Sequence, residues 1–308
     1  MESQITSTIL MVRPAHFGYN EQTANDNAFQ TKSADQSETE ISAKAVQEFD
    51  AFVAKLEEAG VEVLVVEDTE QPVKPDAIFP NNWITTHQDG TIVTYPMYAP
   101  VRRLERRADI LNQLEQNFRV KETLHLEDKE SENLFLEGTG SMILDRRHRL
   151  VYACRSERTS EELLEIFAMK VGYQMILFDA ADAAGKPIYH TNVLMALGKD
   201  LVVICLDAIR DEDSRSNLLD AFDRSGKMVV DISFDQMGAF AGNMLQVENK
   251  AGEPILVMSE QAYSSLRSDQ IEDIQSRSAI LYSPINTIET TGGGSARCMM
   301  AEIFLEKK

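Results

Sequence analysis

The sequence is sparing in cysteine, in basic residues and in long apolar runs. Its 308 residues include three cysteines, an odd and small number that argues against a disulfide framework or a zinc site. No run approaches the ~18 apolar residues that a membrane-spanning helix needs. The apolar stretch near the amino terminus is too short for a secretory signal. We therefore expect a cytoplasmic protein without a membrane partner.

Basic residues are outnumbered, with 30 Lys and Arg against 50 Asp and Glu and a net charge of −20. Such a surface repels phosphate backbones, so we expect no nucleic-acid partner. Hydrophobic residues make up 43% and charged residues 26% of the chain, a mixture typical of a globular protein with a sizeable core. No linker rich in Pro, Gly or Ser interrupts the sequence, so residues 1–308 are expected to form one domain.

Strand-like apolar segments and amphipathic helices alternate in a repeated order. The opening strand, TILMVRP, is followed by a loop from Gly18 to about Glu40, a helix at residues 41–60 and the strand VEVLVVED. Four units then follow, each with two strands joined by a tight turn, a helix and a third strand. Their first strands are AIFPNNWITTH, LFLEGTGSMILD, HTNVLMALG and AGNMLQVEN, and their helices are expected at residues 102–117, 160–172, 214–226 and 261–277.

This repetition indicates the fold. Units that recur every ~45 to 60 residues are typical of a propeller or array. The last segment, CMMAEIFL, would pair with the opening strand, close the ring and leave no exposed edge. A parallel doubly wound sheet is the alternative, but the tight hairpin in each unit requires antiparallel pairing. The sequence therefore predicts an α/β fold, a five-bladed propeller of ββαβ repeats.

Polar residues stand where the first strand of a unit begins, although their surroundings are apolar. Taken alone, each has an ordinary explanation: a histidine before a strand is commonly a hydrogen-bonded structural residue, and a Glu-Gly pair is commonly a turn. Equivalent positions of a ring converge on its axis, however, so these side chains would meet at one end of the central channel. Their recurrence predicts a site that includes Asn81, Asn82, Glu137, His190, Asn243 and Cys298.

The three cysteines differ in their context. Cys154 in LVYACRS and Cys205 in LVVICLD lie in strand-like apolar runs and are expected to be inert core thiols. Cys298 instead follows TTGGGSAR, where three consecutive glycines disfavour a helix or strand interior and predict a loop. A neighbouring cation, either Arg297 or a protonated His190, would stabilise its thiolate. Cys298 is therefore the candidate nucleophile.

Two further side chains suit the chemistry of a thiol nucleophile. His190 can act as general acid toward a leaving amine and then as base for water, while Glu137 can orient that histidine or hold a substrate N–H. His87 and His125 have no second ligand at a useful spacing. We therefore expect neither a metal nor another cofactor.

Four motifs in this order, FPNN, FLEGTGSMIL, HTNV and GGGSARCMM, resemble those of the guanidine-modifying, or pentein, superfamily. That superfamily includes arginine deiminases, agmatine deiminases and dimethylarginine hydrolases. The stretches ACRSERTS and PMYAPVRRLE also resemble arginine deiminase segments, and the opening RPAHFGYNEQTANDNAFQ most resembles the citrulline ureidase branch. The resemblance spans nearly the whole chain and implies the pentein fold, a five-unit α/β propeller.

The resemblance also implies a role for each matching residue. It makes Cys298 the nucleophile, His190 the general acid and base, and Glu137 the carboxylate that partners them. These three roles agree with the chemistry expected from the residue types themselves.

The substrate-contacting residues are expected to include several arginines. Arg158 and either Arg102 or Arg103 match arginines that hold a substrate α-carboxylate by forked hydrogen bonds. For Arg102 and Arg103 the alternative is a solvated helix start. Arg297 and Asn243 complete this expected set.

Two positions depart from the deiminase pattern. Where deiminases grip the cationic guanidinium with two aspartates, this sequence has Asn82 and Asn192. An ionised aspartate only accepts hydrogen bonds, whereas asparagine offers an acceptor and two donors and carries no charge. That combination suits a neutral ureido group, which presents N–H donors together with one carbonyl oxygen. The double change favours citrulline or another ureido compound over arginine.

We interpret the chain as a cysteine-dependent C–N hydrolase that converts citrulline and water to ornithine, carbon dioxide and ammonia. The first alternative is an arginine deiminase, a dihydrolase or an amidinotransferase that acts on a guanidine. The second is a pentein-fold binding protein without catalysis, which the intact Cys, His and Glu set disfavours. The expected partner is a small amino-acid substrate, and a homo-oligomeric state is left open.

Overall fold

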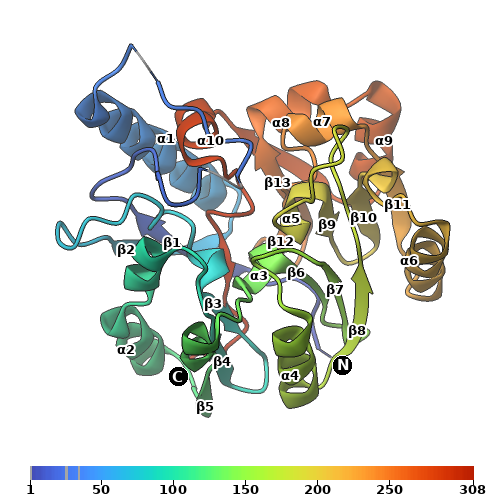
Figure 1. The fold of residues 1–308 in the computed structure, drawn as a ribbon, viewed down its shortest axis with the longest axis horizontal. Coiled ribbons are helices and arrows are strands. Elements are labelled where there is room, and N and C mark those ends of the chain that lie inside the picture. Colours follow the sequence, from blue (N-terminus) through green and yellow to red (C-terminus); the bar gives the residue numbers. More distant parts are fainter. Residues whose placement is uncertain (1, 25–26, 34) are drawn as a thin grey trace.

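The strands of the computed structural model stand in five small sheets around a ring (Figure 1). The structure describes residues 2–24, 27–33 and 35–308, and in this part of the chain every sheet has three strands. The middle strand of each sheet pairs antiparallel with one neighbour and parallel with the other. This arrangement confirms the predicted α/β propeller of ββαβ units.

The strands follow the predicted order along the chain. They are β1 (Thr8–Arg13), β2 (Glu62–Glu67), β3 (Ile84–Thr86), β4 (Thr91–Thr94), β5 (Glu122–His125), β6 (Met142–Asp145), β7 (Leu150–Cys154), β8 (Gln174–Phe178), β9 (Met195–Leu197), β10 (Leu201–Ile204), β11 (Met228–Asp231), β12 (Leu245–Glu248), β13 (Pro254–Ser259), β14 (Ala279–Ser283) and β15 (Ala301–Glu302). The last strand, β15, pairs antiparallel with β1, and β1 pairs parallel with β2. The carboxyl-terminal segment therefore closes the ring as expected.

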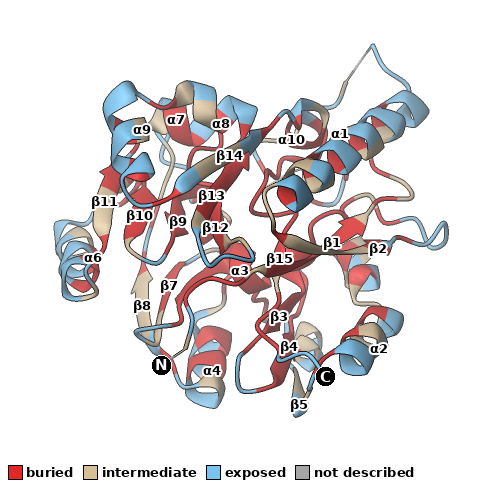
Figure 2. Ribbon diagram, turned by 180° about the vertical axis from the view of Figure 1, so that it is seen from behind, coloured by how far each residue is buried: buried red, intermediate tan, exposed pale blue. Residues whose placement is uncertain are grey.

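The longer helices lie on the outside of the ring (Figure 1), and their outward faces are exposed while the strands are mostly buried (Figure 2). Each one covers the sheet of its own unit, which is where a helix between a middle and a third strand must pass. These helices are α1 (Glu38–Glu58), α2 (Ala108–Asn117), α4 (Glu161–Val171), α6 (Glu212–Arg224), α8 (Glu260–Ser265) and α9 (Ser268–Gln275).

Helix α1 illustrates how the sequence defines these elements. Ser37 caps its start, and the side chain of Glu40 accepts a hydrogen bond from the Ser37 backbone N–H, which satisfies backbone N–H groups that have no helical partner. The expected loop from Gly18 to about Glu40 thus ends at this cap; its residues 25, 26 and 34 lie outside the described residues. The apolar positions recur every three or four residues and are buried, namely Ile41, Ala45, Phe49, Phe52 and Leu56.

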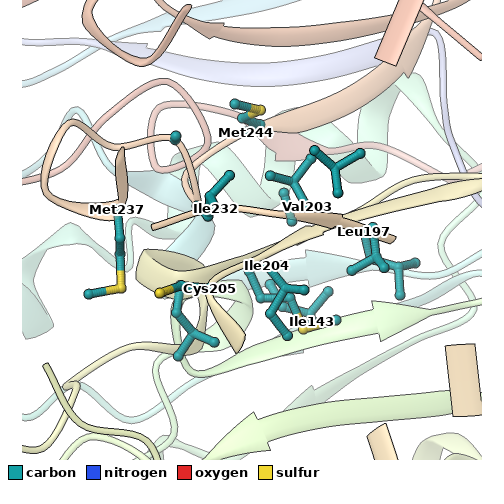
Figure 3. Close-up of a cluster of buried hydrophobic side chains, with 14 of the residues drawn as sticks. Ile143, Leu197, Val203, Ile204, Cys205, Ile232, Met237 and Met244 are labelled. Atoms are coloured by element: carbon teal, nitrogen blue, oxygen red, sulfur yellow. The ribbon is translucent and has the colours of Figure 1, made fainter. Parts of the chain in front are cut away.

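The core between neighbouring sheets is close-packed and apolar. Figure 3 shows one cluster, in which side chains from β6, β9 and β10 meet those that follow β11 and precede β12. Cys205 lies in this cluster, and both Cys205 and Cys154 are fully buried. The expectation that these two thiols belong to the core is confirmed.

Three predicted first strands begin with a short helical turn instead of extended chain. The turns are a 3-10 helix at Pro80–Asn82, helix α3 (Gly138–Ser141) and helix α5 (Thr191–Leu194). Side-chain hydroxyls stabilise them: Ser141 Oγ donates to Arg158 O over 2.6 Å, and Thr191 Oγ1 donates to Ser141 O over 2.5 Å. The Thr191 bond joins two neighbouring blades, and α3 contacts both α5 and the 3-10 helix, so the three turns pack together near the middle of the ring (Figure 1).

Two predicted helices are each interrupted. The helix expected at residues 102–117 is a 3-10 helix at Pro100–Glu105 followed by α2, because residues 106–107 leave helical geometry. The helix expected at 261–277 is α8 followed by α9, with residues 266–267 extended between them. Periodicity alone did not reveal either break.

Candidate active site

A pocket lies near the middle of the ring, where the first strands of several blades begin. Asn82, Arg102, Arg158, His190 and Cys298 line it. It encloses about 300 Å³ of empty space, counting the part that is open to solvent. Residues that are far apart in the sequence therefore share one cavity, as the ring arrangement predicts.

Glu137 and His190 form a buried pair behind the pocket wall. His190 Nε2 lies 2.8 Å from Glu137 Oε2, and Glu137 Oε1 accepts a hydrogen bond from Tyr98 N over 2.9 Å. Burial raises the pKa of Glu137, but two neighbouring arginines and His190 outweigh it and hold that pKa well below its usual range. Burial lowers the pKa of His190, and Glu137 opposes this shift. The low pKa of Glu137 favours its ionised carboxylate, which can stabilise the His190 ring when that ring takes up a proton.

Gly140 explains why the FLEGTG motif contains its second glycine. A Cβ atom at this position would lie 2.8 Å from both Nδ1 and Cε1 of His190 and would also collide with Asn82 Nδ2. The His190 ring packs on its other side against the ring of Tyr189, with 4.8 Å between centroids. Only a residue without a side chain lets the imidazole and the Asn82 amide lie together.

Cys298 lies against two carboxamides. Asn192 Nδ2 is 3.4 Å and Asn243 Nδ2 is 3.3 Å from its Sγ. The side chain is 7% exposed, and its backbone N–H donates to Ser295 O over 2.9 Å. The thiol is thus held in a turn at the edge of the pocket instead of on a free surface loop.

The glycine segment before Cys298 is only partly the loop that the sequence predicts. Thr290, Thr291 and Gly292 belong to helix α10 (Asn286–Gly292). Gly293 then adopts a φ of +65° and ends the helix, a conformation that favours glycine. A Cβ on Gly294 would lie 2.9 Å from the Phe79 ring. The glycines let the backbone pass this ring and form one wall of the pocket.

Arg102 is buried and fixes the orientation of Asn82. Its Nε and Nη2 bind the two oxygens of Glu105 over 2.8 and 2.9 Å, and its Nη1 donates to Asn82 Oδ1 over 2.9 Å. Burial raises the pKa of Glu105 to about 8, with Arg102 opposing this shift. Only 3% of Arg102 is exposed, which rules out the solvated helix start.

Arg158 stands between Glu137 and the pocket. Its Nη1 lies 3.3 Å from Glu137 Oε2, and its guanidinium carbon lies 5.0 Å from the centre of the Tyr189 ring. It is 2% exposed. A buried cation that lines a pocket beside an aromatic ring is well placed to meet an anionic group.

Asp76 is a pocket residue that the sequence reasoning missed. Asn20 Nδ2 donates to Asp76 Oδ2 over 2.7 Å, and Arg102 Nε lies 3.7 Å from the same oxygen. The other oxygen, Oδ1, is buried and has no hydrogen-bond partner among the described residues. Burial raises the pKa of Asp76, and Arg102 opposes that shift. The available signal was a charged residue directly before the apolar run AIF.

Four expected substrate contacts do not line the pocket, namely Arg103, Arg297, Asn243 and Asn192. Arg103 turns away and donates to Met97 O over 3.0 Å, because Arg102 takes the inward position of the 3-10 turn. Arg297 points to the opposite side of the chain, where its Nη2 lies 2.9 Å from Glu302, so its guanidinium faces that carboxylate and not the pocket. Asn243, like Asn192, lies behind the sulfur.

Within the described ranges, no cluster of three or more His, Cys, Asp and Glu side chains is arranged to hold a metal ion. None of the helices in the same ranges is both long and apolar enough to cross a membrane.

Residues 13–305 match the sequence model of a family described as N,N dimethylarginine dimethylhydrolase, eukaryotic. The chain belongs to this family. The match includes Glu137, His190 and Cys298, and it confirms the resemblance to the guanidine-modifying superfamily. A comparison with curated proteins found no match for this member of the dimethylarginine dimethylhydrolase family.

Solved structures of the same fold support this placement. The arginine dihydrolase ArgZ, from the ornithine–ammonia cycle of cyanobacteria, has a TM-score of 0.74 and 18% identity, over 97% of this chain and 40% of ArgZ. Its N-terminal domain, solved as a cysteine-to-serine variant with substrate bound, has a TM-score of 0.74 and 17% identity, over 97% of this chain and 98% of the domain.

A dimethylarginine dimethylaminohydrolase, solved as a histidine-to-glycine variant in an adduct with S-methyl-L-thiocitrulline, is also similar. Its TM-score is 0.64 and its identity 14%, over 97% of this chain and 100% of that one. The present chain therefore spans about 40% of full-length ArgZ, and these likenesses establish the pentein fold.

Proposed function

We propose that this chain hydrolyses the ureido C–N bond of citrulline through a covalent intermediate on Cys298, with ornithine, carbon dioxide and ammonia as products. The observation that carries the proposal is the orientation of two carboxamides beside the nucleophile and its histidine. Their donors and acceptors match a ureido group better than they match a guanidinium.

Asn82 is the first of these carboxamides. Its Oδ1 already accepts from Arg102 Nη1 over 2.9 Å, so its Nδ2 is directed toward Glu137 O, at 3.5 Å, and the side of His190. A guanidinium has only hydrogen-bond donors, so at this position one of its N–H groups would face another donor and could not bind it. A ureido oxygen would meet a hydrogen-bond donor.

Asn192 is the second carboxamide. Its Nδ2 lies 3.4 Å from Cys298 Sγ, while its Oδ1 is buried without a partner in the described part of the chain. A buried acceptor left unpaired is costly, by ~1–3 kcal/mol, and a substrate N–H would relieve that cost. One free acceptor together with N–H donors is the complement of a ureido group.

Three charged residues of the pocket suit the head group of an α-amino acid. Arg158 provides the positive charge for the α-carboxylate, and the nearby guanidinium of Arg102 adds to it. The unpartnered Oδ1 of Asp76 provides an acceptor for the α-ammonium. A zwitterion would therefore find both of its charges compensated inside a buried site, as burial of charge requires.

The chemistry follows from these positions. The Cys298 sulfur attacks the ureido carbon. His190 takes up the thiol proton and becomes an imidazolium, which Glu137 stabilises. N–H groups near the sulfur stabilise the negative charge on the ureido oxygen. His190 then protonates the side-chain nitrogen of ornithine, which leaves while a carbamoyl group stays on sulfur. Water activated by His190 releases carbamate, which decomposes to carbon dioxide and ammonia.

The second candidate is hydrolysis of arginine or a methylated arginine. The Asp76 carboxylate favours it, because a carboxylate with an unpaired oxygen would also accept guanidinium N–H groups, and the family description names a dimethylarginine hydrolase. For this second candidate, the guanidinium of the substrate would lie nearer to Asp76 than to the Asn82 amide.

A substrate panel tests the two candidates. Purified protein is incubated separately with citrulline, arginine, N,N-dimethylarginine and agmatine, and ammonia, ornithine and amine products are quantified. We expect citrulline to give the highest kcat/KM, and agmatine, which has no α-carboxylate, to give no turnover. A clear preference for arginine or its methylated form would overturn the ureido proposal.

A further inference from the structure

We propose that Asn243 and Asn192 form a two-donor cradle that holds Cys298 as a thiolate before any substrate binds. This inference rests on the proposed role of Cys298 as the nucleophile, but it does not depend on which compound is the substrate. It assigns Asn243 to the reacting sulfur and not to the substrate.

The first support is that main-chain groups fix Asn243 at both ends of its amide. Its Oδ1 accepts a hydrogen bond from Arg297 N over 3.1 Å, and its Nδ2 donates to Asn192 O over 2.9 Å. The same Nδ2 lies 3.3 Å from Cys298 Sγ. Rotating the amide by half a turn would break both main-chain bonds, so an N–H always faces the sulfur.

The second support is that Asn192 approaches the same sulfur with its own N–H, at 3.4 Å. Asn243 Oδ1 is the acceptor nearest to a protonated thiol, but it lies 3.6 Å from Sγ and is already used by Arg297 N. The sulfur therefore accepts from two N–H donors. As a thiol it would have to compete with Arg297 N for the single acceptor, Asn243 Oδ1. Hydrogen bonds to an ionised acceptor are roughly twice as strong as neutral ones, so this surrounding favours the thiolate.

The third support is the placement of Arg297, the cation that directly precedes Cys298 in the sequence. The Arg297 guanidinium binds Glu302 and Met300 O, so much of its charge is compensated away from the thiol. It is the Arg297 backbone N–H that acts on the site, by locking Asn243. The thiol proton passes to His190, which borders the same pocket.

The cradle has a chemical consequence for substrate charge. A guanidinium carries a positive charge that can itself stabilise a neighbouring thiolate, whereas a neutral ureido group cannot. An enzyme for a neutral substrate must stabilise the thiolate with its own groups. Two carboxamide donors do so without a further cation beside the sulfur.

The test compares Asn243→Asp and Asn243→Ser with the native protein and measures iodoacetamide labelling of Cys298 against pH, without substrate. Asn243→Asp keeps the shape and the acceptor for Arg297 N but replaces the donor by a carboxylate. We expect its labelling at neutral pH to fall by about 10-fold or more, as the profile moves about one pH unit or more toward alkaline values. At high pH its rate should return to the native rate. Asn243→Ser should shift the profile less, in the same direction.

Asn217→Asp is the matched control, because Asn217 is exposed on α6 and its replacement adds the same charge far from the sulfur. Its profile should equal the native one. Labelling profiles of folded Asn243 variants that coincide with the native profile would overturn the cradle.

A measurement on the native protein keeps the test decisive if the variants fail to fold. The ultraviolet absorbance of the thiolate, taken as the difference between the native protein and Cys298→Ala, should be present at neutral pH without substrate. Its absence would overturn the cradle. Retained turnover by Cys298→Ala would instead overturn the proposed function, and a negative result with citrulline alone would leave the cradle unaffected.

Discussion

His190 Nε2 and Glu137 Oε2 lie 2.8 Å apart in the buried centre of the ring, so the imidazole has a fixed carboxylate partner. Because Glu137 opposes the effect of burial on the pKa of His190, the carboxylate would stabilise an imidazolium in the proposed reaction. The other ring nitrogen, Nδ1, lies beside Gly140.

Replacing Glu137 by Gln should therefore impair chemistry more than binding. We expect kcat to fall by about 10²–10⁴-fold, the usual contribution of a general acid–base group, with a smaller change in KM. Steady-state kinetics on citrulline measure both quantities. Glu132→Gln, at an exposed position, should keep native kinetics, and native kcat in Glu137→Gln would contradict the assigned role.

Replacing Asp76 by Asn should weaken binding of the amino-acid head group. If its unpartnered Oδ1 accepts from the α-ammonium, KM should rise by about 10-fold or more, since a charged hydrogen bond contributes ~1.5–3 kcal/mol, while kcat changes less. Citrulline acetylated on its α-nitrogen should be a poor substrate for the native protein. An unchanged KM in Asp76→Asn would place the ammonium elsewhere.

Replacing both Asn82 and Asn192 by Asp tests the ureido interpretation directly. Acceptor-only groups would face the carbonyl oxygen of citrulline, and a negative charge would stand beside Cys298, so kcat/KM for citrulline should fall by at least 10-fold, or about 1.4 kcal/mol. The measurement is kcat/KM for citrulline and arginine on both proteins. A double variant that matches the native kcat/KM for citrulline would show that these amides do not select the substrate.

The three cysteines should separate into one functional and two structural residues. Cys298→Ala should abolish turnover and keep the thermal unfolding temperature, whereas Cys154→Ala and Cys205→Ala should each lose ~1–2 kcal/mol of stability. Burial raises the pKa of Cys154 and of Cys205 to about 11, so native labelling with iodoacetamide should favour Cys298. Faster labelling of either buried thiol, identified by peptide mass analysis, would refute this assignment.

Glu289 should make stability depend on pH. It lies on α10 and is 1% exposed, and it accepts a hydrogen bond from Ser295 Oγ over 2.6 Å. Burial raises its pKa to about 7, above the ~4.3 of an unfolded chain. Its stabilising contribution to the free energy of unfolding is therefore fully present below about pH 4. This contribution, of up to ~3 kcal/mol, is lost as the pH rises through about 7.

Glu289→Gln keeps the acceptor but cannot ionise. Relative to the native protein, the variant should therefore gain stability between pH 5 and pH 8, measured by urea unfolding. Glu105, whose pKa burial raises to about 8, is present in both proteins and cancels in the difference. An equal pH dependence of the two proteins would contradict the role of Glu289.

The sequence by itself determined the architecture of this protein. Repeated hairpins and amphipathic helices depend on local periodicity and turn chemistry, which act over a few residues. The cap at Ser37, the buried face of α1 and the core position of Cys205 follow from such local patterns. The recurring position of Glu137, His190 and Cys298 at the start of their units also predicted that they would lie close together.

Tertiary structure alone decided which partner each of the remaining polar side chains binds. Arg102 and Arg103 are neighbours in sequence, yet only Arg102 turns inward, where Glu105 and Asn82 pair with it. Arg297 adjoins Cys298 but its guanidinium binds Glu302. Asp76 lines the pocket although no local motif marks it. These outcomes depend on which long-range partner satisfies each buried charge, and a buried polar group takes the partner that the packed chain brings to it.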